Sequence, residues 1–321
     1  MQSFADRLVH AVRQKGTPVC VGLDPRFDLL PRGLQLLARR TYGASARAVA
    51  TAFVEFNRAI LDAVADFVPA CKPQIAFYEE YGAEGVLAFE ETVSYAQSKG
   101  VLVISDAKRG DIGTTAEAYA QAHLGGAGDF LGHGFDADAV TVNPYLGRDS
   151  LEPFLRLSAE RGKGVFILVR TSNPGARDLQ DIDAGGRPMY EHVADLVREL
   201  GGTLGTSGLS DIGAVVGATY PREAQRLREL MPHAPFLVPG YGAQSATAAD
   251  AVAGFPADGL GAVVSSSRGI IFAYRDEPYA SRHGETGFAA AARDAARDMA
   301  DRLNAALEQR TANSERRSVR A

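Results

Sequence analysis

Residues 101–112 read VLVISDAKRGDI. A short run of β-branched and apolar residues, Val101–Ser105, passes without a spacer into a cluster of charged residues. Continuous hydrophobicity over so few residues is typical of a parallel strand that is covered on both faces. The charged cluster follows the carboxyl end of that strand, where α/β proteins place their chemistry. The stretch therefore predicts a buried parallel strand with a candidate site at its end.

Similar apolar runs recur along the chain. With Val101–Ser105 there are eight, and the others are Pro18–Leu23, Ala70–Ile75, Ala139–Val142, Gly164–Val169, Gly213–Val216, Phe236–Val238 and Gly261–Ser265. Amphipathic segments separate them, with apolar residues three or four positions apart, as from Phe53 to Phe67. Further predicted helices are Val86–Ala96, Leu151–Arg161, Met189–Leu200, Pro221–Met231 and Thr247–Ala253. This alternation favours the α/β class and a single closed (β/α)8 TIM barrel, and an open doubly wound sheet is the alternative.

Composition limits the function classes. The chain has 321 residues, 46% of them hydrophobic, which excludes wholesale disorder. Its 34 Lys and Arg against 39 Asp and Glu leave a net charge of −5. The acidic balance argues against nucleic acid as a partner, so an anionic ligand needs a local positive site. Cys20 and Cys71 lie inside apolar runs and are expected to be buried, reduced thiols, with a disulfide as the alternative.

The chain offers neither a targeting signal nor a Cys/His metal-binding spacing. The first residues, MQSFADRLVHAVRQKG, carry charges throughout and contain no apolar h-region. The apolar runs are far too short to cross a bilayer. We therefore expect a cytoplasmic protein with no membrane partner.

We expect one barrel domain over residues 1–309 and a basic, disordered tail over residues 310–321. The tail carries four Arg and one Glu. Three segments exceed a minimal barrel: residues 28–44, residues 125–138 and residues 175–187. The second and third are rich in Gly and Asp and are expected to be loops.

Charged residues at the strand ends are the candidate catalytic groups. Asp106 and Lys108 share one face if the strand extends that far, and Asp111 follows after a glycine. A lysine between two carboxylates stays protonated, so it can stabilise a developing carbanion and then deliver a proton. Lys72, after the second run, either extends to the rim or pairs with Asp106 inside the cavity. A salt-bridged loop at the barrel rim is the alternative for the whole cluster.

Other strand ends carry binding candidates. Asp24, after the first run, is either a turn cap or a ligand to a sugar hydroxyl. Residues 170–175 (RTSNPG) contain hydroxyls and an amide that could contact a polar heterocycle, or they form an ordinary turn. Glycine-rich residues 238–244 and the polar residues 265–271 follow the seventh and eighth runs, where barrels bind phosphate. Arg268 would clamp that phosphate, and Gln244 would contact it from a lid.

The ordered set of motifs resembles the orotidine 5′-phosphate decarboxylases. The segment DAKRGDI at residues 106–112, Lys72, Asp24 and the two phosphate loops carry the resemblance. The segments FVEFNRAIL, KPQIAFYEEYG, TVNPYLG and RTSNPG resemble the longer bacterial subgroup of that family, type 2. The similarity extends from about Phe4 to Leu307.

The resemblance implies an activity and an assembly. It implies conversion of orotidine 5′-monophosphate to UMP and CO2, the last step of de novo UMP biosynthesis, by a homodimer with shared active sites. It also implies that no cofactor and no metal are needed. Lys72, Asp106, Lys108 and Asp111 match the family's charged network, in which Asp111 comes from the partner subunit and Lys108 protonates C6.

The resemblance also implies binding roles. Asp24 and Thr115 match ribose contacts, and Ser172 matches the pyrimidine contact. Pro239, Gln244 and Arg268 match positions of the phosphate loops. The chain departs from many relatives at Ser267, where they have Gly, which leaves that backbone contact to phosphate in question.

Two rival functions remain. Metal-dependent sugar-phosphate lyases of the same superfamily share the DxKxxD motif, but they carry a Glu metal ligand where Lys72 stands, and a lysine cannot replace that ligand. A catalytically inactive, nucleotide-binding barrel is the other rival. It would bind UMP without releasing CO2.

Overall fold

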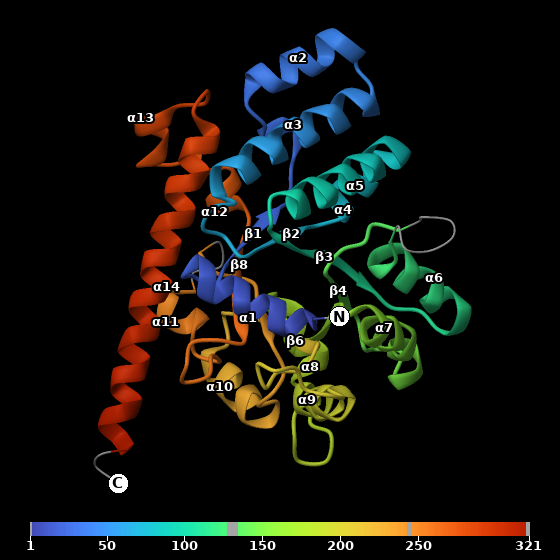
Figure 1. Cartoon of the computed structure of the whole chain (residues 1–321), viewed down its shortest axis with the longest axis vertical. Helices are drawn as coiled ribbons and strands as arrows, with labels where there is room; N and C mark the ends of the chain where they lie inside the picture. The colour runs from blue at the N-terminus through green and yellow to red at the C-terminus, as the bar shows by residue number, and fades with distance from the viewer. Residues whose placement is uncertain (1, 127–133, 243–245, 319–321) are drawn as a thin grey trace.

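Eight parallel strands form a closed barrel in the computed structural model, in the order β1-β2-β3-β4-β5-β6-β7-β8 (Figure 1). The structure describes residues 2–126, 134–242 and 246–318. Neighbours in the barrel are neighbours in the sequence, and β8 pairs with β1 to close it. The predicted (β/α)8 barrel is therefore confirmed, and the open doubly wound sheet is excluded because an open sheet has two unpaired edges.

The strands are β1 Val19–Leu23, β2 Ala70–Pro73, β3 Leu102–Arg109, β4 Ala139–Val142, β5 Gly164–Arg170, β6 Ile212–Val216, β7 Phe236–Val238 and β8 Ala262–Ser266. The α-helices are α1 Phe4–Lys15, α2 Arg32–Tyr42, α3 Ala46–Val64, α4 Ala76–Glu79, α5 Gly82–Ser98, α6 Gly113–Leu124, α7 Arg148–Arg161, α8 Arg177–Gln180, α9 Met189–Leu200, α10 Pro221–Leu230, α11 Ala248–Ala251, α12 Arg268–Ile271, α13 Tyr279–His283 and α14 Phe288–Ser318. Among the described residues, the short 3-10 helices are η1 Phe27–Leu29, η2 Pro174–Ala176 and η3 Ala273–Arg275.

Each predicted apolar run contains the core of a strand. The largest difference is in β3, which continues past Ser105 to Arg109 and so includes the charged residues Asp106 and Lys108. Cys20 and Cys71 are free and buried on β1 and β2, as predicted. Burial on both faces explains why the strands are continuously apolar.

Helix α1 closes the amino-terminal end of the barrel. Phe4, Leu8 and Val12 pack in one cluster with interior residues from all eight strands, and α1 crosses the strands in Figure 1. The Phe4 ring meets the Phe166 ring edge to face at 5.8 Å. A Cβ on Gly164 would lie only 2.3 Å from the Phe4 ring, so glycine is needed for this approach. With this end filled, the carboxyl ends of the strands form the accessible mouth.

The three inserted segments have different structures. Residues 28–44 contain α2, which packs on α3. Within the predicted loop 125–138, residues 127–133 lie outside the described part of the chain. Residues 175–187, predicted as a loop, contain the end of η2 and the short helix α8.

The chain is helical where a disordered tail was expected. Helix α14 starts at Phe288 and continues to Ser318, along one side of the barrel (Figure 1). The Arg310 guanidinium donates hydrogen bonds to the carbonyls of Val252, at 3.1 Å, and Phe255, at 2.6 Å. Residue 310 is therefore no structural boundary, because this arginine anchors the extended helix to the barrel.

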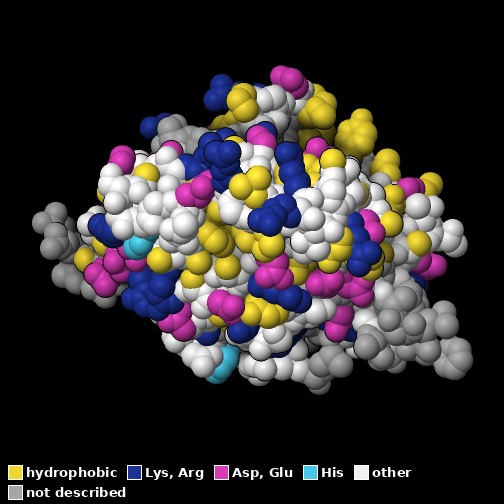
Figure 2. Space-filling model, turned by 90° about the horizontal axis from the view of Figure 1, so that it is seen from above, with side chains coloured by type: hydrophobic (Ala, Val, Ile, Leu, Met, Phe, Trp, Pro, Cys, Tyr) yellow, Lys and Arg dark blue, Asp and Glu magenta, His cyan; other side chains and the backbone are white. Residues whose placement is uncertain are grey.

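Acidic and basic side chains are interspersed on the face shown in Figure 2. Hydrophobic side chains lie between them, and on α2 Leu36 and Leu37 are 50% and 62% exposed. Within the described residues, no helix combines the length and the hydrophobicity that a bilayer-crossing segment needs.

Candidate active site

A cavity of about 810 Å³ opens at the carboxyl ends of the strands. It brings together Lys72, Asp106, Lys108, Ser172 and Pro239, five of the residues that the sequence singled out. Apolar residues from the 175–187 insert and from α9 complete one wall, including Leu179, Ile182, Met189 and Val193. A pocket with charged groups at one end and an apolar wall is suited to a small polar substrate that carries a ring.

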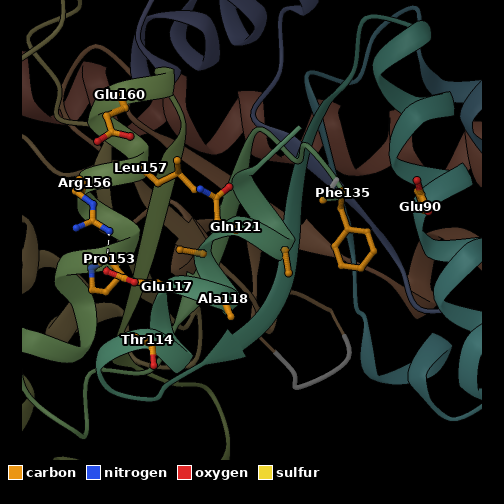
Figure 3. Close-up of a pocket in the computed structure, with 13 residues that line it drawn as sticks. Glu90, Thr114, Glu117, Ala118, Gln121, Phe135, Pro153, Arg156, Leu157 and Glu160 are labelled. Carbon is orange, nitrogen blue, oxygen red and sulfur yellow. Dashed lines mark hydrogen bonds and ion pairs between the residues drawn. The ribbon is translucent and has the colours of Figure 1, made fainter. Parts of the chain in front are cut away.

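A second cavity of about 790 Å³ lies outside the barrel (Figure 3). Its lining comes from α5, α6, α7 and residues 134–135. Glu117 and Arg156 form an ion pair across it at 3.0 Å, and both side chains are largely exposed. Because barrel enzymes use the carboxyl ends of their strands, we assign the active site to the first cavity.

Asp106 lies at the centre of the charged network. Its Oδ2 is 2.5 Å from the Lys72 Nζ, and its Oδ1 is 2.5 Å from the Lys108 Nζ. The side chains of Asp106 and Lys72 are 8% and 7% exposed, whereas that of Lys108 is 44% exposed. One buried carboxylate thus holds two ammonium groups, and the Lys108 ammonium remains accessible to a ligand.

The backbone of β3 directs Lys108 back toward Asp106. The pairing between β3 and β4 shifts register between Ser105 and Arg109, and Lys108 has a left-handed φ of 50°. The Thr141 hydroxyl on β4 accepts hydrogen bonds from the amides of Ala107 and Lys108, at 3.0 and 2.9 Å. The same hydroxyl donates to Asp106 Oδ1 at 3.0 Å. A strained residue held by such contacts is common at functional sites.

The buried pair of Asp106 and Lys72 stays charged at neutral pH. Burial alone would raise the pKa of Asp106, but the positive charges of Lys72 and Lys108 outweigh burial and hold that pKa well below its ordinary value. Burial alone would lower the pKa of Lys72, but Asp106 and Asp24 raise it above its ordinary value. Asp106 is therefore an anion and Lys72 a cation throughout the physiological range.

Asp24 follows β1 beside Lys72, since Gly22 of β1 is in register with Lys72 of β2. Its Oδ1 is buried and has no hydrogen-bond partner among the described residues. A buried acceptor without a donor is costly unless a ligand supplies one. Asp24 does not line the main cavity, but its free oxygen is suited to a hydroxyl donor.

Ser172 and Pro239 lie on loops that follow β5 and β7. A Cβ on Gly217 would lie 2.9 Å from the Cα of Ser172, so this glycine lets the Ser172 loop approach β6 closely. The Pro239 carbonyl accepts a hydrogen bond from the Ala218 amide at 2.9 Å. Both residues line the same cavity as the charged network.

Arg268 lies at a neighbouring cavity of about 530 Å³. Tyr241 and Gly242, after β7, and Ser266 and Gly269, around the end of β8, line this cavity, so the two predicted phosphate loops meet there. Its other charged lining residues are Arg302, Asp276 and Glu277. Gln244 lies outside the described residues.

Ser267, the residue before Arg268, packs over Gly22. A Cβ on Gly22 would lie 1.9 Å from the Ser267 hydroxyl oxygen. Ser267 has a φ of −105°, which residues other than glycine adopt readily. The backbone at this position thus accommodates a side chain.

Asp111 and Thr115 are not lining residues of the main cavity. Asp111 accepts a hydrogen bond from the Ile112 amide at 2.8 Å, and Thr115 is exposed on α6. Ile112, the residue after Asp111, is 55% exposed. Tyr145, at the rim of the main cavity, is 81% exposed.

Sequence reasoning missed several polar residues of the cavity, among them Thr141 and Gln180. Thr141 was counted as part of an apolar strand. Its hydroxyl, on the strand that follows the strand of Asp106 in the sequence, was a possible signal of a polar contact. Gln180, in the insert, lines the cavity and hydrogen-bonds Thr171. No local pattern marks it, because its partner is nine residues away. Among the described residues, no three His, Cys, Asp or Glu side chains cluster as metal ligands.

The fold and the site define a (β/α)8-barrel enzyme with a fixed pair of lysines around one aspartate at the carboxyl ends of its strands. The chain belongs to the orotidine 5′-phosphate decarboxylase / HUMPS family, whose model matches residues 17–282.

Named orotidine 5′-phosphate decarboxylases are similar in sequence to this protein over nearly the whole chain. Orotidine 5′-phosphate decarboxylase of Rhodopirellula baltica is 45% identical over 304 residues, which are 94% of this chain and 99% of the relative. The decarboxylase of Haloarcula marismortui is also 45% identical, over 94% of this chain and 98% of its own length. The structure of Leishmania donovani OMP decarboxylase superposes with a TM-score of 0.71 at 33% identity, covering 95% of this chain and 99% of that one.

Proposed function

We propose that this protein decarboxylates orotidine 5′-monophosphate to UMP and CO2, the last step of de novo UMP biosynthesis. The observation that carries the proposal is the Asp106 carboxylate between the ammonium groups of Lys72 and Lys108, each 2.5 Å away. Loss of CO2 from C6 leaves an electron pair in a vinyl orbital with no easy delocalisation. A fixed ammonium group stabilises that charge without reorganising in the transition state.

The proposed reaction balances with residues of this chain. The bond between C6 and the carboxylate carbon breaks, and its electron pair stays on C6 as CO2 leaves. The Lys108 ammonium donates a proton to C6, which completes UMP, and the neutral amine regains a proton from water. Asp106 stays ionised and orients Lys108, while Lys72 compensates the second oxygen of Asp106 from inside the barrel.

Substrate binding is assigned to the surrounding strand ends. The unpartnered Asp24 oxygen would accept a ribose hydroxyl, and Ser172 would contact the pyrimidine. Arg268 would bind the phosphate where the loops after β7 and β8 meet. Pro239, which lines the main cavity, and Gln244 are further phosphate contacts in this proposal. Binding energy from the phosphate can then close loops around the reacting ring.

A shared active site completes the proposal. Asp111 and Thr115 do not line their own cavity, and exposed apolar residues, Ile112 and Tyr145, lie on neighbouring loops. We assign Asp111 and Thr115 to the cavity of a second copy in a homodimer. The free, buried thiols of Cys20 and Cys71 suit a reducing compartment, and we place the enzyme in the cytoplasm.

Decarboxylation is expected to proceed without a divalent cation. Lys72 stands where the metal-dependent lyases carry a ligand, and two ammonium groups already compensate Asp106. Loss of orotidine 5′-monophosphate absorbance should be equally fast in EDTA and in Mg²⁺. Activity that EDTA abolishes and Mg²⁺ restores would contradict the assignment. UMP binding with no CO2 release would favour the inactive barrel.

Replacing Arg268 by Ala is expected to lower kcat/KM by at least about 10²-fold, because a charge-assisted contact to the phosphate is lost. The loss should largely vanish with orotidine, which lacks the phosphate. Arg156→Ala, which removes an exposed arginine outside the barrel, is the charge-matched control and should leave kcat/KM unchanged. Equal losses on both substrates would show that Arg268 is structural.

A further inference from the structure

Arg170, the last residue of β5, is buried with an exposed fraction of only 1%. Its guanidinium carbon lies 3.8 Å from the centre of the Tyr220 ring and 5.2 Å from that of Tyr190. Its Nη1 is 2.7 Å from Asp181 Oδ1. This side chain therefore connects β5 with the 175–187 insert, with α9 and with the residue before α10.

Gln180 extends this connection to the residue next to Ser172. The Gln180 Oε1 accepts hydrogen bonds from the Thr171 amide at 3.0 Å and from Arg170 Nη1 at 3.4 Å. The Gln180 Nε2 donates to the Thr171 hydroxyl at 2.8 Å. One side-chain amide thus closes the loop from residue 171 to residue 180 by two contacts to Thr171.

The Ser172 loop is also held from the β6 side. The Gly217 amide donates to the Arg170 carbonyl at 2.7 Å, and the Thr219 hydroxyl donates to the Ser172 carbonyl at 3.4 Å. Gly217 has no Cβ, so nothing separates it from Ser172. Because both sides are constrained, the position of Ser172 depends on Gln180 and hence on the side chain that orients Gln180.

Burying an arginine here has a cost. The Arg170 Nε is buried and has no hydrogen-bond partner among the described residues. An apolar residue could fill much of the same volume without leaving a donor unsatisfied. A lysine could keep the charge, but it has no planar group to lie between two rings while forming an ion pair.

We propose that Arg170 is a positioning residue for the loop that recognises the base. Its guanidinium holds Asp181 and Gln180, and Gln180 sets the conformation of Thr171 and Ser172. The inference rests on the proposed function for the ligand of Ser172, but the hold on the loop exists without substrate. On this account the 175–187 insert is a functional part of the site.

Arg170→Lys tests the proposal in two ways. Without ligand, hydrogen exchange of the amides around Thr171 should become faster, because Gln180 is no longer held. With orotidine 5′-monophosphate, kcat/KM should fall about 10- to 100-fold, the range expected for a misplaced binding group. Asp181→Asn is a milder second variant, because the Asp181 side chain is 39% exposed. It should also speed hydrogen exchange around Thr171 and lower kcat/KM.

Ser172→Ala tests whether Arg170→Lys lowers kcat/KM by displacing Ser172. In that background Arg170→Lys should cost little further kcat/KM, because coupled residues are not additive. Arg228→Lys is the matched control, since Arg228 is also stacked on a ring, 3.7 Å from the centre of Phe236, at the opposite end of the barrel. It should lower stability but leave kcat/KM of the folded protein unchanged.

Two results would overturn the proposal: unchanged hydrogen exchange around Thr171 in Arg170→Lys and Asp181→Asn, or fully additive losses with Ser172→Ala. A wild-type protein that fails to decarboxylate the substrate would refute the proposed function instead. Hydrogen exchange would still report on the loop in that case, so the two failures are distinguishable.

Discussion

Asp106→Asn is expected to reduce kcat by about 10³-fold or more, because the Lys108 ammonium loses the anion that orients it. The same change should lower the free energy of unfolding by about 3–5 kcal/mol, the usual cost of leaving one buried partner uncompensated. Here the charge that loses its ion-pair partner is Lys72, whose side chain is 7% exposed. Steady-state kinetics and urea unfolding measure the two losses.

Two control variants separate catalysis from stability. Lys72→Met combined with Asp106→Leu removes both charges and should recover most of the stability while remaining inactive. Asp62→Asn removes the partner of Lys99 on the surface, where both side chains are well exposed, and should cost at most about 1 kcal/mol. Near-normal kcat in Asp106→Asn would contradict the role given to this carboxylate.

The difference in the free energy of unfolding between wild type and Asp106→Asn should also depend on pH. The folded protein holds the pKa of Asp106 below its ordinary value, so ionised Asp106 contributes stability above the ordinary pKa, and this contribution is lost as the pH falls. The difference between wild type and Asp106→Asn should therefore be full at neutral pH and shrink below about pH 4. A difference that grows in acid would show that Asp106 is not stabilised as an anion.

Lys108→Ala and Asp111→Ala should each be nearly inactive alone and regain activity when mixed. In a mixed dimer, one cavity receives wild-type Lys108 and wild-type Asp111, and the other receives neither. Random exchange makes about half of the dimers mixed, each with one good site of two, so recovery should approach about a quarter of wild-type activity.

Mass-tagged chains show whether subunits exchange. If the mixture exchanges and stays inactive, Asp111 acts within its own subunit and the shared site is wrong. A mixture of Lys108→Ala and Asp106→Ala is the control. Both residues belong to the same cavity, so every cavity in every dimer carries one of the two defects and no recovery is expected.

The barrel could be predicted because its strands are apolar on both faces and recur with helices between them. The pairing of Lys72 with Asp106 could also be expected, since both lie toward the carboxyl ends of neighbouring strands, which meet at one mouth. The tail could not be predicted in the same way. Its basic composition suggested disorder, but the anchoring of Arg310 to carbonyls near α11 depends on distant residues.

The polar residues that support the site could not be predicted either, because their contacts are with residues distant in the sequence. Thr141 is an ordinary strand residue until the register shift in β3 brings two amides and a carboxylate to its hydroxyl. Arg170 follows an apolar run like many strand-end residues, and its ring and carboxylate partners come from three separate segments.

The sequence by itself determined the barrel, the order of the strands and which strand ends carry charge, because hydrophobic periodicity and local residue type are properties of short segments. Only the tertiary structure decided how those ends meet. It placed Lys108 back against Asp106 by a left-handed residue and a register shift, and it brought the ends of β7 and β8 together around the cavity that Arg268 lines. These features depend on contacts between segments far apart in the chain, and such contacts form only when the barrel closes.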